Sequence, residues 1–498
     1  MNVFTQKFEH FAFDNSYARL PDRFFVRHRP TPVAAPRLVR LNGNLARHLG
    51  FDPALLATPE GVAFLAGNAV PAGGEPIAMA YAGHQFGNFV PQLGDGRAIL
   101  LGEVIDCDGV RRDIQLKGAG RTPFSRQGDG RAALGPVLRE YIVSEAMAQL
   151  GIPTTRALAA VKTGETVWRE TALPGAVLTR VASSHIRIGT FQFFAARGDL
   201  EAVQQLADHV IARHYPEADG AANRYYALLE LVISRQAELI AKWILVGFIH
   251  GVMNTDNMSI AGETIDYGPC AFMDAYHPAM VYSSIDSGGR YRFGNQPRIA
   301  QWNLARLAET MLPLIAENEA SAIEQAEAAI GAFTAHFESA YSAGLNRKLG
   351  LLRSQPGDLS LAQDLLERMA RNGADFTLTF RHLCDAGASP DGDATVRSLF
   401  ESPGDFDDWA VRWRQRLADE GCASGERPEV MRAANPRFIP RNHLVEEAIS
   451  AAVDRNDFSV FETLLAVLSA PCEEQPQFGR FSDPPRPDQV VHQTFCGT

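Results

Sequence analysis

The segment that decides the fold spans residues 250–274 and reads HGVMNTDNMSIAGETIDYGPCAFMD. It follows a stretch, residues 223–248, in which apolar residues recur at helical spacing. Asp256 and Asn257 come directly after this predicted helix, and Asp266 opens an Asp-Tyr-Gly turn. The spacing fits a short hairpin that brings Asn257 and Asp266 face to face, and such oxygen ligands suit a hard divalent cation. An acidic loop with helix-capping residues is the alternative interpretation.

A glycine turn and a lysine lie upstream of this segment. Residues 94–117 read as a glycine turn followed by two strands, which are joined by a hairpin turn at 106–109 and end at Lys117. Gly94 and Gly96 would let the backbone approach phosphate groups, and Lys117 would grip them as a point charge. This order is typical of the nucleotide-binding lobe of protein-kinase-like enzymes. A plain turn and a surface lysine are the alternative.

The helix that follows offers two partners for Lys117. The sequence GPVLREYIVSEAMAQLG has Pro136 near its start and Gly151 just past its end, which is the normal punctuation of a helix. Kinase-like enzymes hold the lysine with a glutamate of this helix, and both Glu140 and Glu145 qualify. Apolar residues lie on both sides of the helical wheel, so the wheel does not choose between them.

The glycine turn at residues 94–98 reads GDGRA, and the same pentapeptide occurs again at residues 128–132. The first copy leads into a predicted strand, and the second leads into a predicted helix. Because the two contexts differ, a duplicated module is not expected. Arg180, in a predicted strand at 175–181, and Arg187 add two cations to the anion site. Together with Lys117, Arg97 and Arg131, they give the predicted cleft more cations than a simple phosphate transfer requires. Arginines that merely pair with surface carboxylates are the alternative.

The pattern as a whole predicts an α+β, two-lobed protein-kinase-like fold, with a ligand cleft between a β-rich lobe and a helical lobe. A second hairpin is predicted at 157–170, turning at Thr163-Gly164, and the last predicted helix spans 443–469. The Pro-rich segment 471–490 is interpreted as a surface tail. The expected divisions are an N-terminal extension packed on the core (1–75), the nucleotide-binding lobe (76–182), the helical lobe with the catalytic and metal-binding loops (183–400), and a C-terminal helical extension and tail (401–498).

Composition narrows the class of protein. The net charge of -11 argues against a nucleic-acid binder, which would need a basic surface. The most apolar stretch, AELIAKWILVGFIHG, carries Lys242 and is too short to span a bilayer, so no membrane partner is expected. Six cysteines without a C-x-x-C pair favour a reducing cytosol over a disulfide framework. No long heptad pattern is present, which favours a monomer.

Long, ordered stretches of the chain resemble the selenoprotein O family, a kinase-like fold found in bacteria and mitochondria. The stretches that carry the resemblance are YAGHQFGNFVPQLGDGRA, QLKGAGRTPFSRQGDGRAAL, LREYIVSEAM, SSHIRIGTFQ, HGVMNTDNMSIAGETIDYGPCAFMD, YSSIDSGGRYRFGNQP and NPRFIPRNHLVEEA. The resemblance implies transfer of AMP from ATP to Ser, Thr or Tyr hydroxyl groups of other proteins, in the bacterial cytoplasm. It also implies that the nucleotide binds flipped relative to ordinary kinases.

The resemblance assigns roles to individual residues. Asp256 would be the catalytic base, while Asn257 and Asp266 would hold Mg²⁺ or, as the alternative, Mn²⁺. Glu140, rather than Glu145, would support the lysine. The ATP-binding residues would be Gly94, Gly96, Arg97, Lys117, Asp129, Gly130, Arg180 and Arg187.

Members of this family often carry a selenocysteine or cysteine close to the C-terminus, and this chain ends in TFCGT, which contains Cys496. A disulfide between Cys496 and Cys270, two residues after the Asp-Tyr-Gly turn, would make the activity redox-dependent. Two separate thiols in a reducing cytosol are the alternative.

Three other activities stay open at this point: a kinase that transfers the γ-phosphate, a UMP transferase that uses UTP, and a binding protein without catalysis. Arg180 and Arg187 favour nucleotide transfer, because a pyrophosphate leaving group calls for extra positive charge. The complete set of Lys117, Asp256, Asn257 and Asp266 argues against a catalytically inactive protein. No base-reading pattern distinguishes ATP from UTP.

Overall fold

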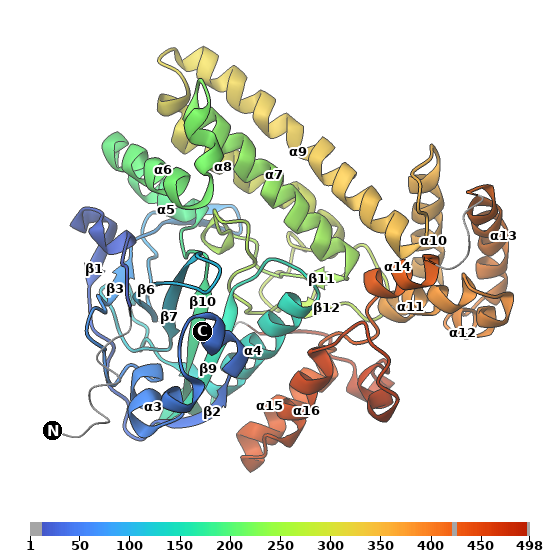
Figure 1. Ribbon diagram of the computed structural model, residues 1–498, viewed down its shortest axis with the longest axis horizontal. Helices are drawn as coiled ribbons and strands as arrows, with labels where there is room; N and C mark the ends of the chain where they lie inside the picture. The colour runs from blue at the N-terminus through green and yellow to red at the C-terminus, as the bar shows by residue number, and fades with distance from the viewer. Residues whose placement is uncertain (1–11, 421–425, 496–498) are drawn as a thin grey trace.

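The computed structural model describes residues 12–420 and 426–495. Figure 1 shows two lobes, one built on strands and one on long helices, so the predicted α+β architecture is confirmed. The N-terminal lobe is an antiparallel sheet in the order β1-β3-β6-β7-β10-β9-β2, with β8 paired to β10. Its strands are β1 (Phe25–Arg27), β2 (Arg37–Leu41), β3 (Ile77–Met79), β6 (Ala98–Ile105), β7 (Arg111–Lys117), β8 (Ala132–Ala133), β9 (Arg156–Trp168) and β10 (Ala172–Ala182).

The hairpin of β6 and β7 forms as the sequence predicts. Asp106 stabilises its turn, because Asp106 Oδ1 accepts hydrogen bonds from the backbone N–H groups of Asp108 (3.0 Å) and Val110 (2.8 Å). The register pairs Ala98 with Lys117 at the other end of the hairpin. Lys117 therefore lies beside the residue that follows the first glycine turn.

Each face of the sheet is covered by helices. One face packs against α1 (Gly43–His48), α2 (Pro53–Leu56) and α3 (Pro59–Leu65), which share a buried apolar cluster with β6, β7 and β9. The other face packs against α4 (Leu134–Gln149), and the C-terminal helices α15 (Asn442–Arg455) and α16 (Ser459–Leu468) cover α4 in turn. The ends of α4 follow the predicted punctuation, with Pro136 in the first turn and Gly151 at φ +71° beyond the last.

Strand β9 contradicts the prediction of a hairpin at 157–170. It continues without a turn from Arg156 to Trp168 and then turns back into β10. Gly164 has φ +75°, and a Cβ atom added there would lie 2.6 Å from Ala35 Cβ. The backbone N–H of Ala35 donates to Thr163 O (2.9 Å). The glycine is needed because another segment crosses the strand closely, and not because the chain turns.

Residues 28–36, which we call the strap, connect the two edge strands β1 and β2 and cross the loop that follows β7. The backbone N–H of Thr31 donates to Ala119 O (2.8 Å), and the Arg131 guanidinium donates to Thr31 O (3.1 Å). His28 Nε2 lies 2.8 Å from Arg121 O. The first part of the chain therefore supplies both edges of the sheet and a bridge between them.

The helical lobe has one large apolar core, formed mainly by its long helices. Figure 1 shows α7, α8 and α9 side by side, with α10 to α14 at their far end. In the described ranges, no helix combines the length and apolar character that a membrane span requires. The helices are α5 (Ile188–Ala195), α6 (Leu200–His214), α7 (Arg224–Leu245), α8 (Gln296–Ile315), α9 (Glu319–Lys348), α10 (Asp358–Asn372), α11 (Phe376–Ala386), α12 (Asp393–Arg397), α13 (Pro403–Asp419) and α14 (Arg427–Ala434).

Two predictions near the C-terminus are wrong. The helix expected at 443–469 is two helices, because Asn456 adopts the left-handed conformation (φ 53°) and ends α15. The segment 471–490 is not only a surface tail. Phe481 is buried in the cluster of α4 and α15, and Arg441 Nε donates to Ser482 O (3.0 Å).

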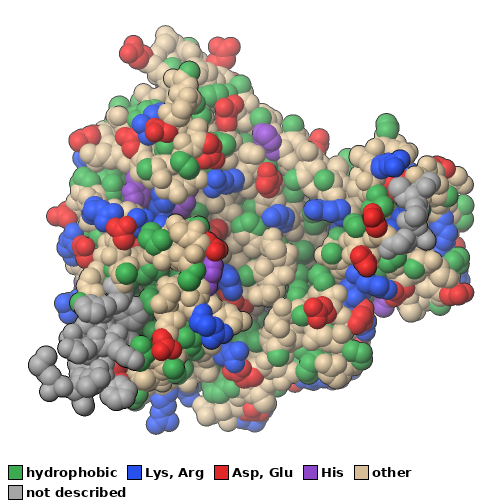
Figure 2. All heavy atoms as spheres, in the orientation of Figure 1, with side chains coloured by type: hydrophobic (Ala, Val, Ile, Leu, Met, Phe, Trp, Pro, Cys, Tyr) green, Lys and Arg blue, Asp and Glu red, His purple; other side chains and the backbone are tan. Residues whose placement is uncertain are grey.

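Charged side chains of both signs are interspersed on the face shown in Figure 2. The acidic net charge is therefore not gathered into one patch on that face.

Candidate active site

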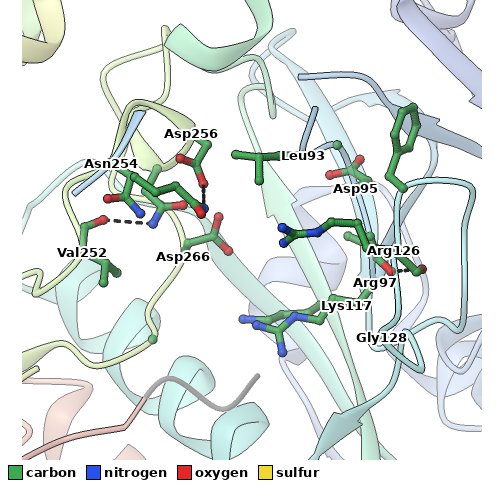
Figure 3. Close-up of a pocket in the computed structure, with 18 of the residues that line it drawn as sticks. Leu93, Asp95, Arg97, Lys117, Arg126, Gly128, Val252, Asn254, Asp256 and Asp266 are labelled. Atoms are coloured by element: carbon green, nitrogen blue, oxygen red, sulfur yellow. Dashed lines mark hydrogen bonds between the residues drawn. The ribbon is translucent and has the colours of Figure 1, made fainter. Parts of the chain in front are cut away.

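A cleft of about 590 Å³ lies between the two lobes. Figure 3 shows Asp256 and Asp266 on one side and Arg97 and Lys117 on the other. Both GDGRA copies reach the cleft. The residues predicted for nucleotide, base and metal all line it: Gly94, Gly96, Arg97, Lys117, Asp129, Gly130, Arg180, Arg187, Asp256, Asn257 and Asp266.

A short two-stranded ladder holds the ends of residues 250–270, which carry the predicted base and metal ligands and which we call the catalytic segment. Strand β11 (Phe248–Ile249) follows α7 and precedes the segment. It pairs antiparallel with β12 (Ala271–Phe272), which follows the segment. His250, fully buried, donates through Nε2 to Ile265 O (2.9 Å) and stacks on Trp243 at 5.4 Å. These contacts fix both arms of the loop, so that the acidic residues between them face the cleft.

Asp256 lies in a short 3-10 turn, Thr255–Asn257, and is buried. Its Oδ2 accepts a hydrogen bond from Gln85 Nε2 (3.1 Å), and its buried Oδ1 has no partner in the described structure. Burial raises the pKa of Asp256 to about 6, although the hydrogen bond from Gln85 acts to lower it. The carboxyl group can therefore be ionised near neutral pH and still be a useful proton acceptor.

Asp266 is held differently. Its φ is +64°, a conformation that non-glycine residues rarely adopt and that is concentrated at functional sites. Arg180 Nη2 lies 2.6 Å from Asp266 Oδ1, and Arg187 Nη1 lies 3.3 Å from Oδ2. Burial acts to raise the pKa of Asp266, but these two guanidinium groups hold it well below its usual range. Asp266 is therefore ionised over the whole working pH range.

The residues on this side fit a divalent metal ion. The Asn257 amide nitrogen donates to Val252 O (2.9 Å), which leaves the amide oxygen to face a cation. Together with the ionised Asp266 it forms a set of hard oxygen ligands. The described residues hold no cluster of three or more His, Cys, Asp or Glu side chains suited to a metal. Phosphate oxygens and water would complete the shell, as is usual for Mg²⁺.

The opposite wall contains a buried ion-pair network around Glu140. Lys117 Nζ lies 2.5 Å from Glu140 Oε2, and Arg180 Nε contacts Glu140 Oε1. Burial lowers the pKa of Lys117, with the Arg180 charge adding to that effect and Glu140 opposing it. Glu145 instead pairs with Arg156 (2.7 Å). The structure thus places Glu140, of the two candidates, against the lysine.

The two GDGRA loops pack against each other. A Cβ atom added at Gly94, where φ is +72°, would lie 2.3 Å from the Phe124 ring. Thr122, in the loop that leads to the second copy, donates from Oγ1 to Asp95 O (2.6 Å). At Gly130, with φ +70°, an added Cβ atom would lie 2.1 Å from Gly120 C. Gly94 is therefore required for the close approach of the two loops, and Gly130 for the close approach of the second loop to its own residue Gly120.

Asp129 marks the mouth of the cleft. Its Oδ2 accepts from Arg169 Nη1 (2.8 Å), and its Oδ1 accepts from the backbone N–H of Arg131 (2.9 Å). Its carboxylate is thus fixed by a neighbouring arginine in this structure.

Sequence reasoning missed Gln85 and Tyr81. Gln85 donates to Asp256, and the Arg187 guanidinium lies over the Tyr81 ring at 4.4 Å. Both residues belong to the stretch YAGHQFGN, in which two glycines flank a His-Gln-Phe tripeptide. That pattern predicts a tight hairpin, but nothing local shows which segment the hairpin will touch.

The predicted redox pair is described only in part. Cys270 is buried, and burial raises the pKa of its thiol to about 12. Cys496 lies outside the described residues. Nearby, Thr494 Oγ1 donates to Pro269 O (2.6 Å), so residue 494 lies beside the catalytic segment.

A two-lobed α+β fold whose cleft gathers a buried carboxylate, oxygen ligands for a metal, and several cations defines a kinase-like enzyme that transfers a phosphorus-containing group. The sequence model of the family described as protein adenylyltransferase SelO matches residues 7–469. Protein nucleotidyltransferase YdiU from Bradyrhizobium diazoefficiens is 66% identical over 489 residues, which cover 98% of this chain and 99% of that protein. The protein of that name from Methylorubrum extorquens (strain PA1) is 66% identical over 494 residues, covering 98% of this chain and 99% of that protein.

The chain belongs to the SelO family, which confirms the resemblance seen in the sequence. It is a nucleotidyltransferase with a kinase-like fold.

Proposed function

We propose that the protein transfers AMP from ATP to Ser, Thr or Tyr hydroxyl groups of other proteins. The acceptor oxygen attacks the α-phosphorus, a bond between it and the acceptor forms, and the bond to the bridging oxygen of the β-phosphate breaks. Pyrophosphate leaves, and the hydroxyl proton passes to Asp256. The family description names adenylyl transfer, and the relatives are named as acting on proteins, which supports this choice.

The observation that carries the proposal is a buried carboxylate that meets buried cations in one cleft. The Asp256 carboxylate receives a hydrogen bond from a neutral side chain, whereas Arg187 donates to the backbone oxygen of Asp256 (3.1 Å). Burial raises the pKa of Asp256 and outweighs the Arg187 charge, which acts to lower it. With a pKa of about 6, Asp256 is mostly ionised near neutral pH and can accept the proton from the attacking hydroxyl.

Three buried cations suit the leaving group. Lys117, Arg180 and Arg187 line the cleft and would contact phosphate oxygens, the arginines by paired hydrogen bonds. In AMP transfer, negative charge develops on the pyrophosphate leaving group. Cations around the β- and γ-phosphates stabilise that charge, so the three buried cations favour attack at the α-phosphate over attack at the γ-phosphate. When bound, a divalent cation such as Mg²⁺ or Mn²⁺ would neutralise phosphate charge, and Asn257 and Asp266 would hold it.

The test compares three labelled nucleotides. Purified protein is incubated with a bacterial lysate and with ATP labelled at the α-phosphate, ATP labelled at the γ-phosphate, or UTP labelled at the α-phosphate. We expect protein labelling from α-labelled ATP alone. Labelling from the γ-label would establish a kinase, and stronger labelling from UTP would establish a UMP transferase.

Asp256→Asn removes the proton acceptor without changing the size of the side chain, and labelling should be lost. Asp408→Asn, a change of the same kind at an exposed residue, is the matched control. If Asp256→Asn labels proteins as fast as the unchanged enzyme, Asp256 is not the base.

A further inference from the structure

A second hairpin reaches from the N-terminal lobe onto the catalytic segment. Among the strands that the structure describes, β4 (Gly83–Gln85) and β5 (Asn88–Val90) pair only with each other and lie outside the eight-stranded sheet. In this register Gln85 lies opposite Asn88. Gln85 also lines the cleft, whereas Asn88 is exposed.

Three consecutive residues of the hairpin contact three consecutive residues of the catalytic turn. The backbone N–H of His84 donates to Thr255 Oγ1 (2.7 Å). The backbone N–H of Phe86 donates to Asn254 Oδ1 (3.2 Å). Between them, Gln85 Nε2 donates to Asp256 Oδ2 (3.1 Å). The hairpin is therefore bonded to each residue of the segment 254–256, which carries the proposed base.

Neighbouring side chains hold the hairpin independently of Gln85. The buried Tyr291 hydroxyl donates to Asn254 Oδ1 (2.7 Å) and accepts from the backbone N–H of Phe86 (3.1 Å). Thr255 Oγ1 donates to Gln192 Oε1 (2.6 Å), and Gln192 Nε2 lies 2.8 Å from His84 Nδ1. Removing the Gln85 amide would leave all of these contacts in place.

The approach of the two segments is unusually close. A Cβ atom added at Gly83 would lie 2.5 Å from Asp256 Oδ1, so only glycine fits there. Phe86 has φ +50°, a costly conformation for an aromatic residue, and such outliers are concentrated at functional sites. Because Oδ1 lies against Gly83 without a donor, the contact of Gln85 with Oδ2 sets the orientation of the carboxylate.

We infer that Gln85 is a positioning residue for the transfer reaction, which holds Asp256 Oδ2 where the acceptor hydroxyl must donate its proton. This inference rests on the proposed function, in which Asp256 is the base. The choice of an amide is significant, because an uncharged donor orients a carboxylate without cancelling its charge. Asp266, which two arginines hold, shows the other arrangement in the same cleft.

The test uses two variants and one control on the same hairpin. Gln85→Ala removes the donor, and Gln85→Met keeps the size of the side chain but cannot donate and adds no charge beside Asp256. Asn88→Ala changes the exposed residue opposite Gln85. The rate of labelling from α-labelled ATP is measured against ATP concentration with a fixed amount of bacterial lysate as the acceptor, and a thermal melt of each variant reports folding.

Both Gln85 variants should lower the rate at saturating ATP by about tenfold or more, because small misplacements of a catalytic group cost that much. The half-saturating ATP concentration should stay within about twofold, and Asn88→Ala should behave like the unchanged enzyme. A role confined to filling space would leave Gln85→Met fully active. If Gln85→Ala melts early, Gln85→Met decides the question alone.

The inference is overturned if both variants keep the full rate, or if raising ATP restores it. An Asp256→Asn sample in the same series distinguishes a failure of the Gln85 inference from a failure of the proposed base. If that sample is inactive while the Gln85 variants are fully active, only the role of Gln85 is wrong. If it is active, the proposed base itself is wrong.

Discussion

Two buried carboxylates on opposite walls of the cleft, Glu140 and Asp256, are held in opposite ways. On the N-terminal wall, Glu140 is shared by Lys117 and Arg180, and all three side chains are buried. On the C-terminal wall, Asp256 is equally buried but receives its side-chain hydrogen bond from the neutral Gln85, as far as the described residues show. Paired charges stabilise a fold and fix protonation states, whereas a carboxylate without a cation stays basic. We therefore expect activity and stability to depend on different walls.

The largest effect should follow from Asp256→Asn. Removing a general base lowers a rate by about 10²–10⁴-fold, so labelling from α-labelled ATP should fall to that extent. The free energy of unfolding should not fall, because the amide replaces a buried carboxyl group whose Oδ1 has no partner. Initial rates and urea unfolding test this pair of outcomes. A large loss of unfolding free energy would show that Asp256 stabilises the fold as Glu140 does.

Glu140→Ala should show the opposite balance. It leaves Lys117 and Arg180 buried without the carboxylate they share, and breaking a buried ion pair costs about 3–5 kcal/mol. Urea unfolding should detect this loss. Glu338→Ala, at an exposed position of α9, is the control and should be close to neutral. Unchanged stability in Glu140→Ala would show that the network is not what holds this wall.

The pH dependence of the rate sharpens the comparison. Burial raises the pKa of Asp256 to about 6, and only the ionised form accepts a proton. Activity should therefore be nearly constant above that value and fall about tenfold for each pH unit below it. Asp266 should not contribute, because its pKa lies well below the usual range. Initial rates between pH 5 and 8 measure this, and an acid limb centred near the ordinary Asp pKa would contradict it.

The smallest effect should come from Glu145→Gln. Glu145 contacts Arg156 at 2.7 Å and also accepts from the backbone N–H of Ala157 (2.9 Å), and the glutamine would keep an oxygen acceptor. Only the arginine side of this pair is partly solvated, so the cost in unfolding free energy should be about 1–3 kcal/mol. The rate at saturating ATP should not change, because Glu145 does not line the cleft. A loss of stability as large as that of Glu140→Ala would mean that the two glutamates share one role.

Local signals were enough to predict the elements that frame the site. The hairpin of β6 and β7 has an Asp-Gly turn, α4 has its proline and glycine at the ends, and α7 has apolar residues at helical spacing. Each of these patterns depends on residues close together in the sequence. Three of the residues predicted to line the cleft lie at the ends of these elements: Gly94 and Gly96 precede β6, and Lys117 ends β7.

What the sequence could not provide was long-range contact. Thr163-Gly164 predicts a turn, but Gly164 lies within a strand that the segment of Ala35 crosses. The Pro-rich segment around Phe481 predicts an exposed tail, but Phe481 packs against α4 and α15. The choice between Glu140 and Glu145 depends on which strand the helix faces. Gln85 was missed because its partner, Asp256, lies 171 residues away along the chain.

The strap braces one wall of the cleft. Its ends continue into the edge strands β1 and β2, and its middle is bonded to the loop that carries the second GDGRA copy, through Thr31 and Arg131. This loop is therefore tied to both edges of the sheet. A nucleotide bound against it would rest on a surface that is fastened at three places, although the strap that fastens it lies far from the cleft-lining glycines along the chain.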